Sequence, residues 1–257
     1  MDAPDPDPSL LRGRVAVITG ASRGIGAGLA AEFAARGLRL GLCSRSEPAV
    51  PAGADALTAR VDVGDGSAVE TFAAQVAERF GRIDLWINNA GVLDPVKPVR
   101  ELSADELEAH LRTNLIGVLH GTKAFLRHLA ARGASEQDPG VLINISSGAA
   151  WHGYAGWGAY CAGKAAVDRL TETVQLEEAG RGLRAWAVAP GVVDTAMQER
   201  IRSCDREVFP EIDRFLALKE AEAFNSIPFI ARHLLAIAFD PTAAPAEVVV
   251  RLPAERG

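Results

Sequence analysis

The chain has 257 residues, which is enough for one large α/β domain with a substantial buried core. Its 48% hydrophobic and 23% charged residues are typical of a globular protein and exclude a disordered chain. The net charge of −6 argues against a nucleic-acid partner, because a protein that binds phosphate backbones needs a basic face.

After a leader over residues 1–12 that we expect to be flexible, short β-rich runs alternate with longer helical stretches. This alternation is typical of βαβ units around a parallel sheet. Strands are predicted over residues 15–19, 38–43, 56–61, 85–88, 141–146, 183–189 and 247–252. Several are apolar at nearly every position, as expected for strands that helices cover on both faces. We therefore expect one α/β domain over residues 13–257, built on a doubly wound parallel sheet.

Helices are predicted where apolar residues recur at three- and four-residue intervals, over residues 26–36, 67–80, 104–132 and 159–178. Ser67 and Ser103 are the expected N-caps, and Glu106 completes a capping box with Ser103. The segment 195–229 differs, because it carries many charges, isolated aromatic residues and two prolines. Ligands of such folds bind beyond the carboxyl ends of the strands, so this segment is predicted to form a helical substrate lid.

The sequence carries no signal for export or membrane insertion, so a cytoplasmic protein is expected. No apolar run approaches the roughly 20 residues needed to cross a bilayer, and the first residues are acidic and proline-rich. The cysteines, Cys43, Cys161 and Cys204, are odd in number and far apart, which indicates reduced thiols. The histidines form no pair of the kind that zinc sites use, so no metal is expected.

A glycine-rich loop, Thr-Gly-Ala-Ser-Arg-Gly-Ile-Gly over residues 19–26, follows the first strand and opens the first long helix. Such glycines allow a tight turn and let backbone N–H groups approach a pyrophosphate at the positive end of the helix. Alone, the loop also fits an ordinary turn, but its position between strand and helix is the one that a dinucleotide site requires. The loop predicts a Rossmann-type site, with contacts from Gly20, Ser22, Arg23, Gly24, Ile25 and Gly26.

Five motifs in order make residues 13–252 resemble the short-chain dehydrogenase/reductase family. They are the loop spacing Gly-x-x-x-Gly-x-Gly, Asn88-Asn89-Ala90-Gly91, Asn114, Ser147 with Tyr160-Cys161-Ala162-Gly163-Lys164, and Pro190-Gly191-Val192-Val193-Asp194-Thr195. By themselves, residues 88–91 also fit a strand-to-turn transition, but agreement of all five motifs by chance is negligible. The resemblance implies a nicotinamide cofactor, with further contacts from Asp62, Val63, Asn89, Ala90, Gly91, Tyr160, Lys164, Pro190, Gly191, Val193 and Thr195.

The end of the second strand favours the phosphorylated cofactor. An acidic residue there would repel a 2′-phosphate, whereas this chain has Ser44 followed by Arg45. The Arg45 guanidinium matches phosphate oxygens, and Arg23 in the glycine loop supplies a second cation on the same side. Either arginine alone also fits a solvated surface charge. Together they predict NADP(H) rather than NAD(H).

Tyr160 and Lys164 lie four residues apart on a predicted helix, so both side chains share one face. A phenol has a pKa of about 10, and we expect the nearby ammonium to lower it so that Tyr160 can act as general acid. Tyr-x-x-x-Lys alone is common on solvated helices. The resemblance adds Ser147, thirteen residues before Tyr160, as the hydrogen-bond donor to the substrate oxygen, with Ser146 as the adjacent alternative. It also implies that Asn114 disturbs its helix and holds a water that links Lys164 to solvent.

The residues 156–166, 176–178 and 193–198 resemble the branch of the family that contains sepiapterin reductases and benzil reductases. The resemblance implies reduction of a carbonyl group beside a second carbonyl group. A pterin would need an acidic anchor near the C-terminus, where only Glu255 is available. The predicted substrate pocket consists of Ser147, Trp151, Tyr154, Trp157, Tyr160, Gly191 and Met197, with Phe209 and Phe215 on the lid. The aromatic residues fit packing within the lid or a dimer surface equally well.

We therefore predict an NADPH-dependent carbonyl reductase that acts on a small 1,2-dicarbonyl compound or aromatic diketone. The alternatives are a sepiapterin reductase, a secondary alcohol dehydrogenase and, in a different class, an NADP-binding sensor or regulator without catalysis. The complete set of Asn114, Ser147, Tyr160 and Lys164 argues against a sensor. A homodimer or homotetramer is expected from the resemblance, through the helices 104–132 and 159–178.

Overall fold

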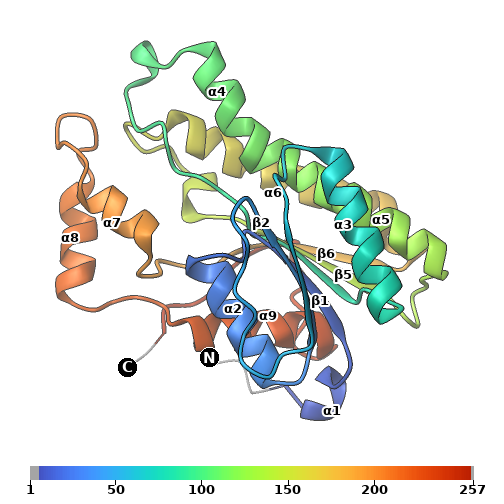
Figure 1. Ribbon diagram of the computed structural model, residues 1–257. Helices are drawn as coiled ribbons and strands as arrows, with labels where there is room; N and C mark the ends of the chain where they lie inside the picture. The colour runs from blue at the N-terminus through green and yellow to red at the C-terminus, as the bar shows by residue number, and fades with distance from the viewer. Residues whose placement is uncertain (1–5, 256–257) are drawn as a thin grey trace.

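Within residues 6–255, which the computed structural model describes, seven strands form one parallel sheet in the order β3-β2-β1-β4-β5-β6-β7 (Figure 1). The strand order changes direction between β1 and β4, which is where such sheets open a crevice for ligands. The doubly wound Rossmann-type fold is thereby confirmed. The strands are β1 (Val15–Thr19), β2 (Arg39–Ser44), β3 (Ala56–Arg60), β4 (Leu85–Asn88), β5 (Gly140–Ile145), β6 (Leu183–Ala189) and β7 (Val249–Arg251).

The strand boundaries follow the pairing partners. The predictions for 15–19, 85–88 and 183–189 agree with β1, β4 and β6. The prediction 56–61 is one residue too long, and the predictions 38–43 and 141–146 are displaced by one residue at both ends, since β2 continues to Ser44 opposite Arg60 and β5 begins at Gly140 opposite Leu183. The prediction 247–252 is too long. This edge strand pairs only with the last three residues of β6.

Helices cover both faces of the sheet (Figure 1). On one face α2 (Gly24–Ala35) packs against α9 (Ile227–Phe239), with Phe33 and Phe229 in the same apolar cluster as the sheet residues. On the other face lie α3 (Gly66–Phe80), α5 (Gly117–Arg132) and α6 (Gly158–Glu178). The sheet is therefore buried on both sides, as its apolar strands require. No helix in residues 6–255 is long and apolar enough to cross a membrane.

The structure differs from two local predictions, the flexible leader and the N-cap at Ser67. Helix α1 (Pro8–Leu11) falls inside the expected flexible leader, and its Leu11 side chain is buried in the core. Residues 1–5 of that leader, and residues 256–257 of the predicted domain, lie outside the described residues. Ser67 does not cap α3, because the Asp65 carboxylate accepts the Ser67 and Ala68 N–H groups. The capping box at the start of α4 (Ala104–Leu111) is present as predicted.

The predicted helix 104–132 is not continuous. It consists of α4 and α5 joined by a π turn over Arg112–Ile116, and Asn114 lies inside that turn. π turns insert an extra residue into a helix and are frequent at functional sites. The local disturbance expected at Asn114 is therefore present.

The segment predicted as a lid, 195–229, divides into two parts. Helices α7 (Ala196–Arg202) and α8 (Ile212–Glu220), orange in Figure 1, stand at the side of the sheet. The remainder, from Ile227, is the start of α9, a core helix capped by Ser226 and with a proline in its first turn. The predicted lid can therefore include α7 and α8 but not α9, so its predicted end at residue 229 is too late.

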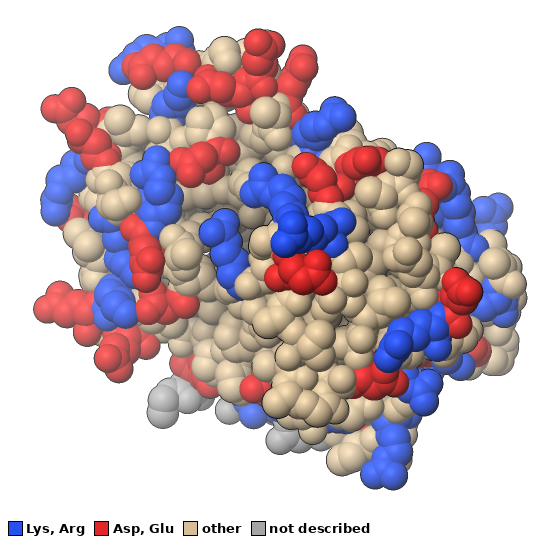
Figure 2. Space-filling model, in the orientation of Figure 1, with Lys and Arg blue, Asp and Glu red and all other residues tan. Residues whose placement is uncertain are grey.

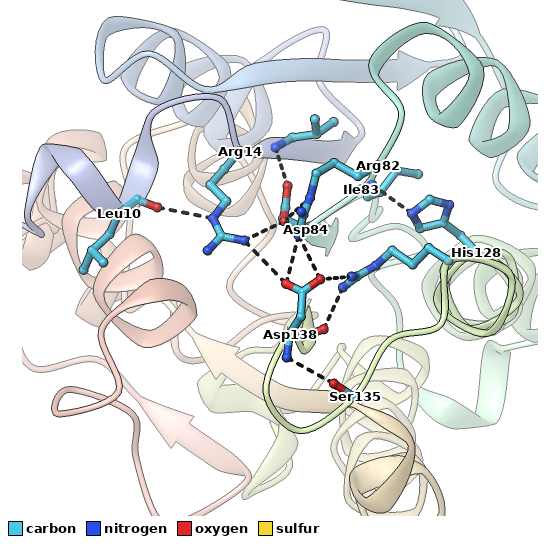
Figure 3. Close-up of polar contacts among 10 residues, drawn as sticks. Leu10, Arg14, Arg82, Ile83, Asp84, His128, Ser135 and Asp138 are labelled. Atoms are coloured by element: carbon cyan, nitrogen blue, oxygen red, sulfur yellow. Dashed lines mark hydrogen bonds and ion pairs between the residues drawn. The ribbon is translucent and has the colours of Figure 1, made fainter.

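A buried carboxylate ties the amino ends of the central strands together (Figure 3). Asp84, which is 1% exposed, accepts the Val15 N–H group at 2.9 Å and bonds from Arg14 and Arg82 at 2.8 Å each. Asp138 lies across from it, bonded to Arg82 at 3.0 Å. The network joins β1, β4 and the loop before β5 at the end of the sheet that faces away from the ligand crevice.

Replacement of Asp84 by alanine is expected to destabilise the protein by about 3 kcal/mol, because it leaves the buried Val15 N–H group without its acceptor and removes the buried carboxylate that pairs with Arg14 and Arg82. Urea unfolding followed by circular dichroism measures the change. Asp138→Ala is the control, since this carboxylate is half exposed and should contribute less than about 1 kcal/mol. Equal effects of the two substitutions would contradict the assignment of Asp84 as the central acceptor.

Candidate active site

A cavity of about 870 Å³ opens at the carboxyl ends of the strands and extends from the glycine loop to the lid. Figure 2 shows this face hollowed between the lid and the body of the protein, with Lys and Arg side chains at the rim. Of the residues predicted to contact the cofactor, Gly26 alone does not line the cavity. Those that do are Gly20, Ser22, Arg23, Gly24, Ile25, Ser44, Arg45, Asp62, Val63, Asn89, Ala90, Gly91, Tyr160, Lys164, Pro190, Gly191, Val193 and Thr195.

The glycine loop fits a pyrophosphate. Gly20 has a φ of +67°, and a Cβ atom there would lie 2.7 Å from the Ala90 Cα, so only glycine allows this approach. Asn89 donates to the Thr19 carbonyl at 2.8 Å and fixes the loop against the end of β4. Helix α2 begins at Gly24 without a side-chain cap, so its N–H groups can receive an anion. Gly26 lies behind the loop, where a Cβ atom would be 2.4 Å from the Gly20 carbonyl oxygen.

The adenosine end of the cavity is basic. Arg23 and Arg45 both line it, are exposed, and have no carboxylate partner among residues 6–255. Ser44 at the end of β2 donates to the Ser46 carbonyl and carries no charge. Asp62 binds the Gly64 N–H group at 2.9 Å. The two guanidinium groups are therefore available to a phosphate beside the end of β2.

The start of α6 brings the predicted catalytic side chains together at the end of β5. The Lys164 ammonium donates to the Ile145 carbonyl at 2.7 Å and lies 5.8 Å from the centre of the Tyr160 ring. Ser147 is the second residue after β5, begins a short 3₁₀ turn and lies close enough to Tyr160 to act against the rise in the pKa of that phenol. All three line the cavity, so one pocket holds a phenol, a hydroxyl and an ammonium.

The effect of Lys164 on Tyr160 differs from the prediction. Burial raises the pKa of Tyr160, and the hydrogen bond from Ser147 offsets this only in part. Burial also lowers the pKa of Lys164 to about 8, although Asp168 acts in the opposite direction. The expected acidification of the phenol by the ammonium is therefore wrong for this state of the protein, because burial is the largest influence on the pKa of each group. The phenol keeps its proton at neutral pH.

Asn114 does not line the cavity but lies directly behind it. Its side chain accepts the Val92 N–H group and donates to the Val92 carbonyl, both at 2.8 Å. A Cβ atom on Gly91 would be 3.3 Å from the Asn114 Oδ1 atom and 3.9 Å from the Lys164 Nζ atom. The π turn thus places the Asn114 amide close to Lys164 and fixes it to the loop after β4.

Two polar residues of this site were not predicted. The His110 ring lies 2.9 Å from the Asp94 carbonyl oxygen through Nδ1 and 2.6 Å from the Asn114 amide nitrogen through Nε2. Since the carbonyl can only accept, Nδ1 carries the proton and Nε2 accepts from Asn114. Asp168 lies one turn after Lys164 and accepts the Ser146 hydroxyl proton. In the sequence, His110 lies four residues before Asn114 and Asp168 lies four residues after Lys164, and this helical spacing was the only pattern that could have indicated their proximity.

Most, but not all, of the residues predicted for the substrate pocket line the cavity. Tyr154, Trp157, Gly191 and Met197 line the cavity, together with Phe215 of the lid. Two aromatic residues do not: Trp151 is 45% exposed on the surface, and Phe209 is buried behind Trp157, on which it stacks at 4.6 Å. The lid also contributes residues that were not predicted, namely Gln198, Arg200, Ile201 and Arg214.

The chain is similar to known enzymes over most of its length. Residues 14–206 match the family described as short chain dehydrogenase. The benzil reductase ((S)-benzoin forming) of Bacillus subtilis strain 168 is 34% identical over 229 residues, which cover 86% of this chain and 91% of that protein. Its counterpart from Bacillus cereus is 32% identical over 231 residues, covering 85% and 91%. The crystal structure of levodione reductase has a TM-score of 0.80 and 28% identity, covering 93% of this chain and 95% of that one.

Replacement of Lys164 by methionine is expected to abolish activity but to stabilise the protein without ligands by about 2 kcal/mol at pH 7. A pKa lowered from 10.5 to about 8 means that the charged lysine opposes folding by about 3 kcal/mol. The substitution removes this cost but also removes the hydrogen bond to Ile145, which contributes about 1 kcal/mol to stability. Below pH 8 the folded chain bears this penalty in full. It disappears as the pH rises to about 10.5, where the unfolded lysine is also neutral.

The measurement is urea unfolding of both proteins between pH 7 and pH 10.5, with Lys123→Met as the exposed control on α5. The stability difference caused by Lys164→Met should shrink across this range, while that caused by Lys123→Met should change little. A difference that is constant with pH would show that the buried ammonium does not oppose folding.

Proposed function

The chain belongs to the short-chain dehydrogenase family, and we propose that it is an NADPH-dependent reductase of aromatic 1,2-dicarbonyl compounds. Membership makes it an oxidoreductase acting on CH–OH or C=O groups with a nicotinamide cofactor. The observation that carries the proposal is that Ser147, Tyr160 and Lys164 line the same cavity as the glycine loop. A phosphate-binding loop and a proton donor thus line the same cavity, where one can bind a cofactor and the other can protonate a substrate.

In this mechanism Ser147 and Tyr160 bind the carbonyl oxygen of the substrate, since both hydroxyls face the cavity beside each other. When bound, the nicotinamide supplies hydride to the carbonyl carbon. Tyr160 donates its proton to the oxygen as negative charge develops there, and the raised pKa keeps this proton in place beforehand. The Ser147 hydroxyl stabilises the same charge.

Lys164 and Asn114 then restore the proton. The ammonium lies beside the Tyr160 ring, and the Asn114 amide lies behind it, next to the loop after β4. We expect a water held near Asn114 to connect Lys164 with solvent. The tie of Asn114 to Val92 and to His110 keeps its amide in one orientation, which such a relay needs.

Two features support NADPH over NADH. Arg23 and Arg45 line the adenosine end without a carboxylate partner in the described part of the chain, and Ser44 stands where an acidic residue would exclude a phosphate. The 2′-phosphate would receive charge-assisted bonds from both guanidinium groups, each of about 1.5–3 kcal/mol before screening.

The wall of the cavity beside Tyr160 supports an aromatic substrate. Trp157 stands edge-on to the Tyr160 ring at 5.7 Å, and Phe215 lies 5.6 Å from Trp157. The benzil reductases of the two Bacillus species act on a compound of this class. A pterin is less suitable, because Glu255 binds the Ser226 N–H and hydroxyl groups at the start of α9 and does not line the cavity.

We also propose that the protein forms a homodimer or homotetramer through α4, α5 and α6. Leu176 on α6 is 85% exposed, and Ile116 in the π turn is 37% exposed. Both lie on the helices for which the family resemblance implies an interface. Large exposed apolar residues on such helices favour burial against a second copy.

Tyr160→Phe is expected to lower turnover by a factor of about 10² to 10⁴, because it removes the proton donor, while the protein still binds NADPH. Loss of NADPH absorbance measures turnover with benzil, sepiapterin, simple ketones and aldehydes, and cofactor fluorescence measures binding. Benzil should be the best substrate. A fully active variant would refute the role of Tyr160, and binding of NADPH without reduction of any carbonyl compound would favour the sensor alternative.

Arg45→Ala is expected to raise the dissociation constant of NADPH by a factor of about 10 to 100, because one charge-assisted bond to the 2′-phosphate is lost. The dissociation constant of NADH should change far less. Arg39→Ala is the matched control at the opposite end of β2, where the arginine pairs with Asp55. Unchanged NADPH binding in Arg45→Ala would overturn the NADP assignment.

A further inference from the structure

The cavity is basic although the protein is acidic. The chain has a net charge of −6, yet the side chains that line the cavity include six cations and two carboxylates, Asp62 and Asp94. The cations are Arg23, Arg45, Lys164, Arg200, Arg214 and Arg251. A cleft with charge of one sign and apolar walls concentrates its field on a ligand of the opposite sign. The cavity therefore favours anionic ligands.

The proposed cofactor and the proton relay account for only part of this charge. Arg23 and Arg45 lie at the adenosine end, and Lys164 lies beside Tyr160. On the lid, Arg200 binds Asp94 through two bonds of 2.9 and 3.2 Å and is thereby neutralised. Arg251 at the end of β7 and Arg214 on α8 remain, and Arg214 is the one that hydrogen-bonds Tyr154 of the predicted substrate pocket.

Arg214 has no carboxylate partner among residues 6–255. Its guanidinium donates to the Tyr154 hydroxyl at 3.1 Å. The neighbouring Asp213 instead pairs with Arg206 at 2.8 Å. A guanidinium has five N–H donors in a planar fork, so most of those of Arg214 are free to bind a further acceptor.

A continuous aromatic wall connects Arg214 with the reacting end of the cavity. The Tyr154 ring, which holds Arg214 through its hydroxyl, lies 5.1 Å from the Trp157 ring. The Trp157 ring lies 5.7 Å from the Tyr160 ring. A flat substrate along this wall would place one end at Tyr160 and the other, two ring spacings away, at Arg214.

We propose that the substrate carries a carboxylate at the end remote from the reduced ketone, and that Arg214 binds this carboxylate. The inference rests on the proposed reductase function and narrows it to aromatic ketones and diketones that bear an acid group. A planar carboxylate can accept two parallel bonds from the guanidinium. Tyr154 orients Arg214 toward the cavity, so the acid end and the carbonyl end bind to separate elements, α8 and α6.

The test compares benzil-4-carboxylate with its methyl ester, which has the same diketone but no charge. The ratio of the kcat/KM values for acid and ester with NADPH is expected to be at least about tenfold in the wild type, for one charge-assisted bond. Arg214→Gln should bring this ratio to about one, and Arg214→Lys should retain part of it, since a point charge remains. Arg206→Gln is the control on the lid, because Arg206 is exposed and does not line the cavity.

Quenching of tryptophan fluorescence gives a second readout without turnover. The acid should bind more tightly than the ester to the wild type, and added salt should weaken only the binding of the acid. Arg214→Gln should remove both differences.

Equal wild-type kinetics for acid and ester would overturn the role of Arg214 while the reductase function stands. If no diketone is reduced, the proposed function fails, and the fluorescence comparison decides separately whether Arg214 binds a carboxylate. Equal binding of acid and ester would then overturn the inference as well.

Discussion

The hydrogen bond from the buried Lys164 ammonium to the Ile145 carbonyl holds the first turns of α6 at the end of the central strand β5. A second bond, from the Ser146 hydroxyl to the Asp168 carboxylate, joins the same helix to the end of β5 one turn further along. The bond to Ile145 also offsets part of the free-energy cost of burying the Lys164 ammonium. Burial lowers the pKa of Lys164 to about 8, which is close to physiological pH, so the side chain can both donate and accept a proton there.

The parts of the site come from opposite sides of the change in strand order. The loop after β1 and the loop after β4 meet where Asn89 bonds to Thr19, and they form the phosphate end. The loops after β5 and β6 form the reacting end, with Ser147 and Gly191 at their starts. Elements distant in sequence thus converge because parallel strands all end at one edge of the sheet. The lid then adds the apolar and basic side chains that distinguish one substrate from another.

Sequence patterns predicted what depends on local order and spacing. The strands 15–19, 85–88 and 183–189, the glycine loop and the capping box at Ser103 all follow from residues that are neighbours in the chain. Helix α9 was missed because its start at Ile227 is apolar and carries a proline, which resembles a loop.

Properties that depend on burial or on the direction of a side chain were not predictable in this way. The spacing of Tyr160 and Lys164 places them on one helix face but does not show that burial dominates the pKa of both groups. Likewise, the position of Trp151 between Ser147 and Tyr160 does not show that its ring points to solvent. The sequence does not show which lid arginines are paired. Arg200 is neutralised by Asp94, which is far away in the chain, whereas Arg214 has no carboxylate partner in the described part of the chain, and only the fold distinguishes the two.

The π turn between α4 and α5 leaves no freedom, even of a single residue, in the length of the chain that joins the two helices. A deletion there would restore regular winding and rotate α4 by about 100° about its axis, carrying His110 away from Asp94. The number of residues between α4 and α5 is therefore part of the architecture that positions His110 and Asn114.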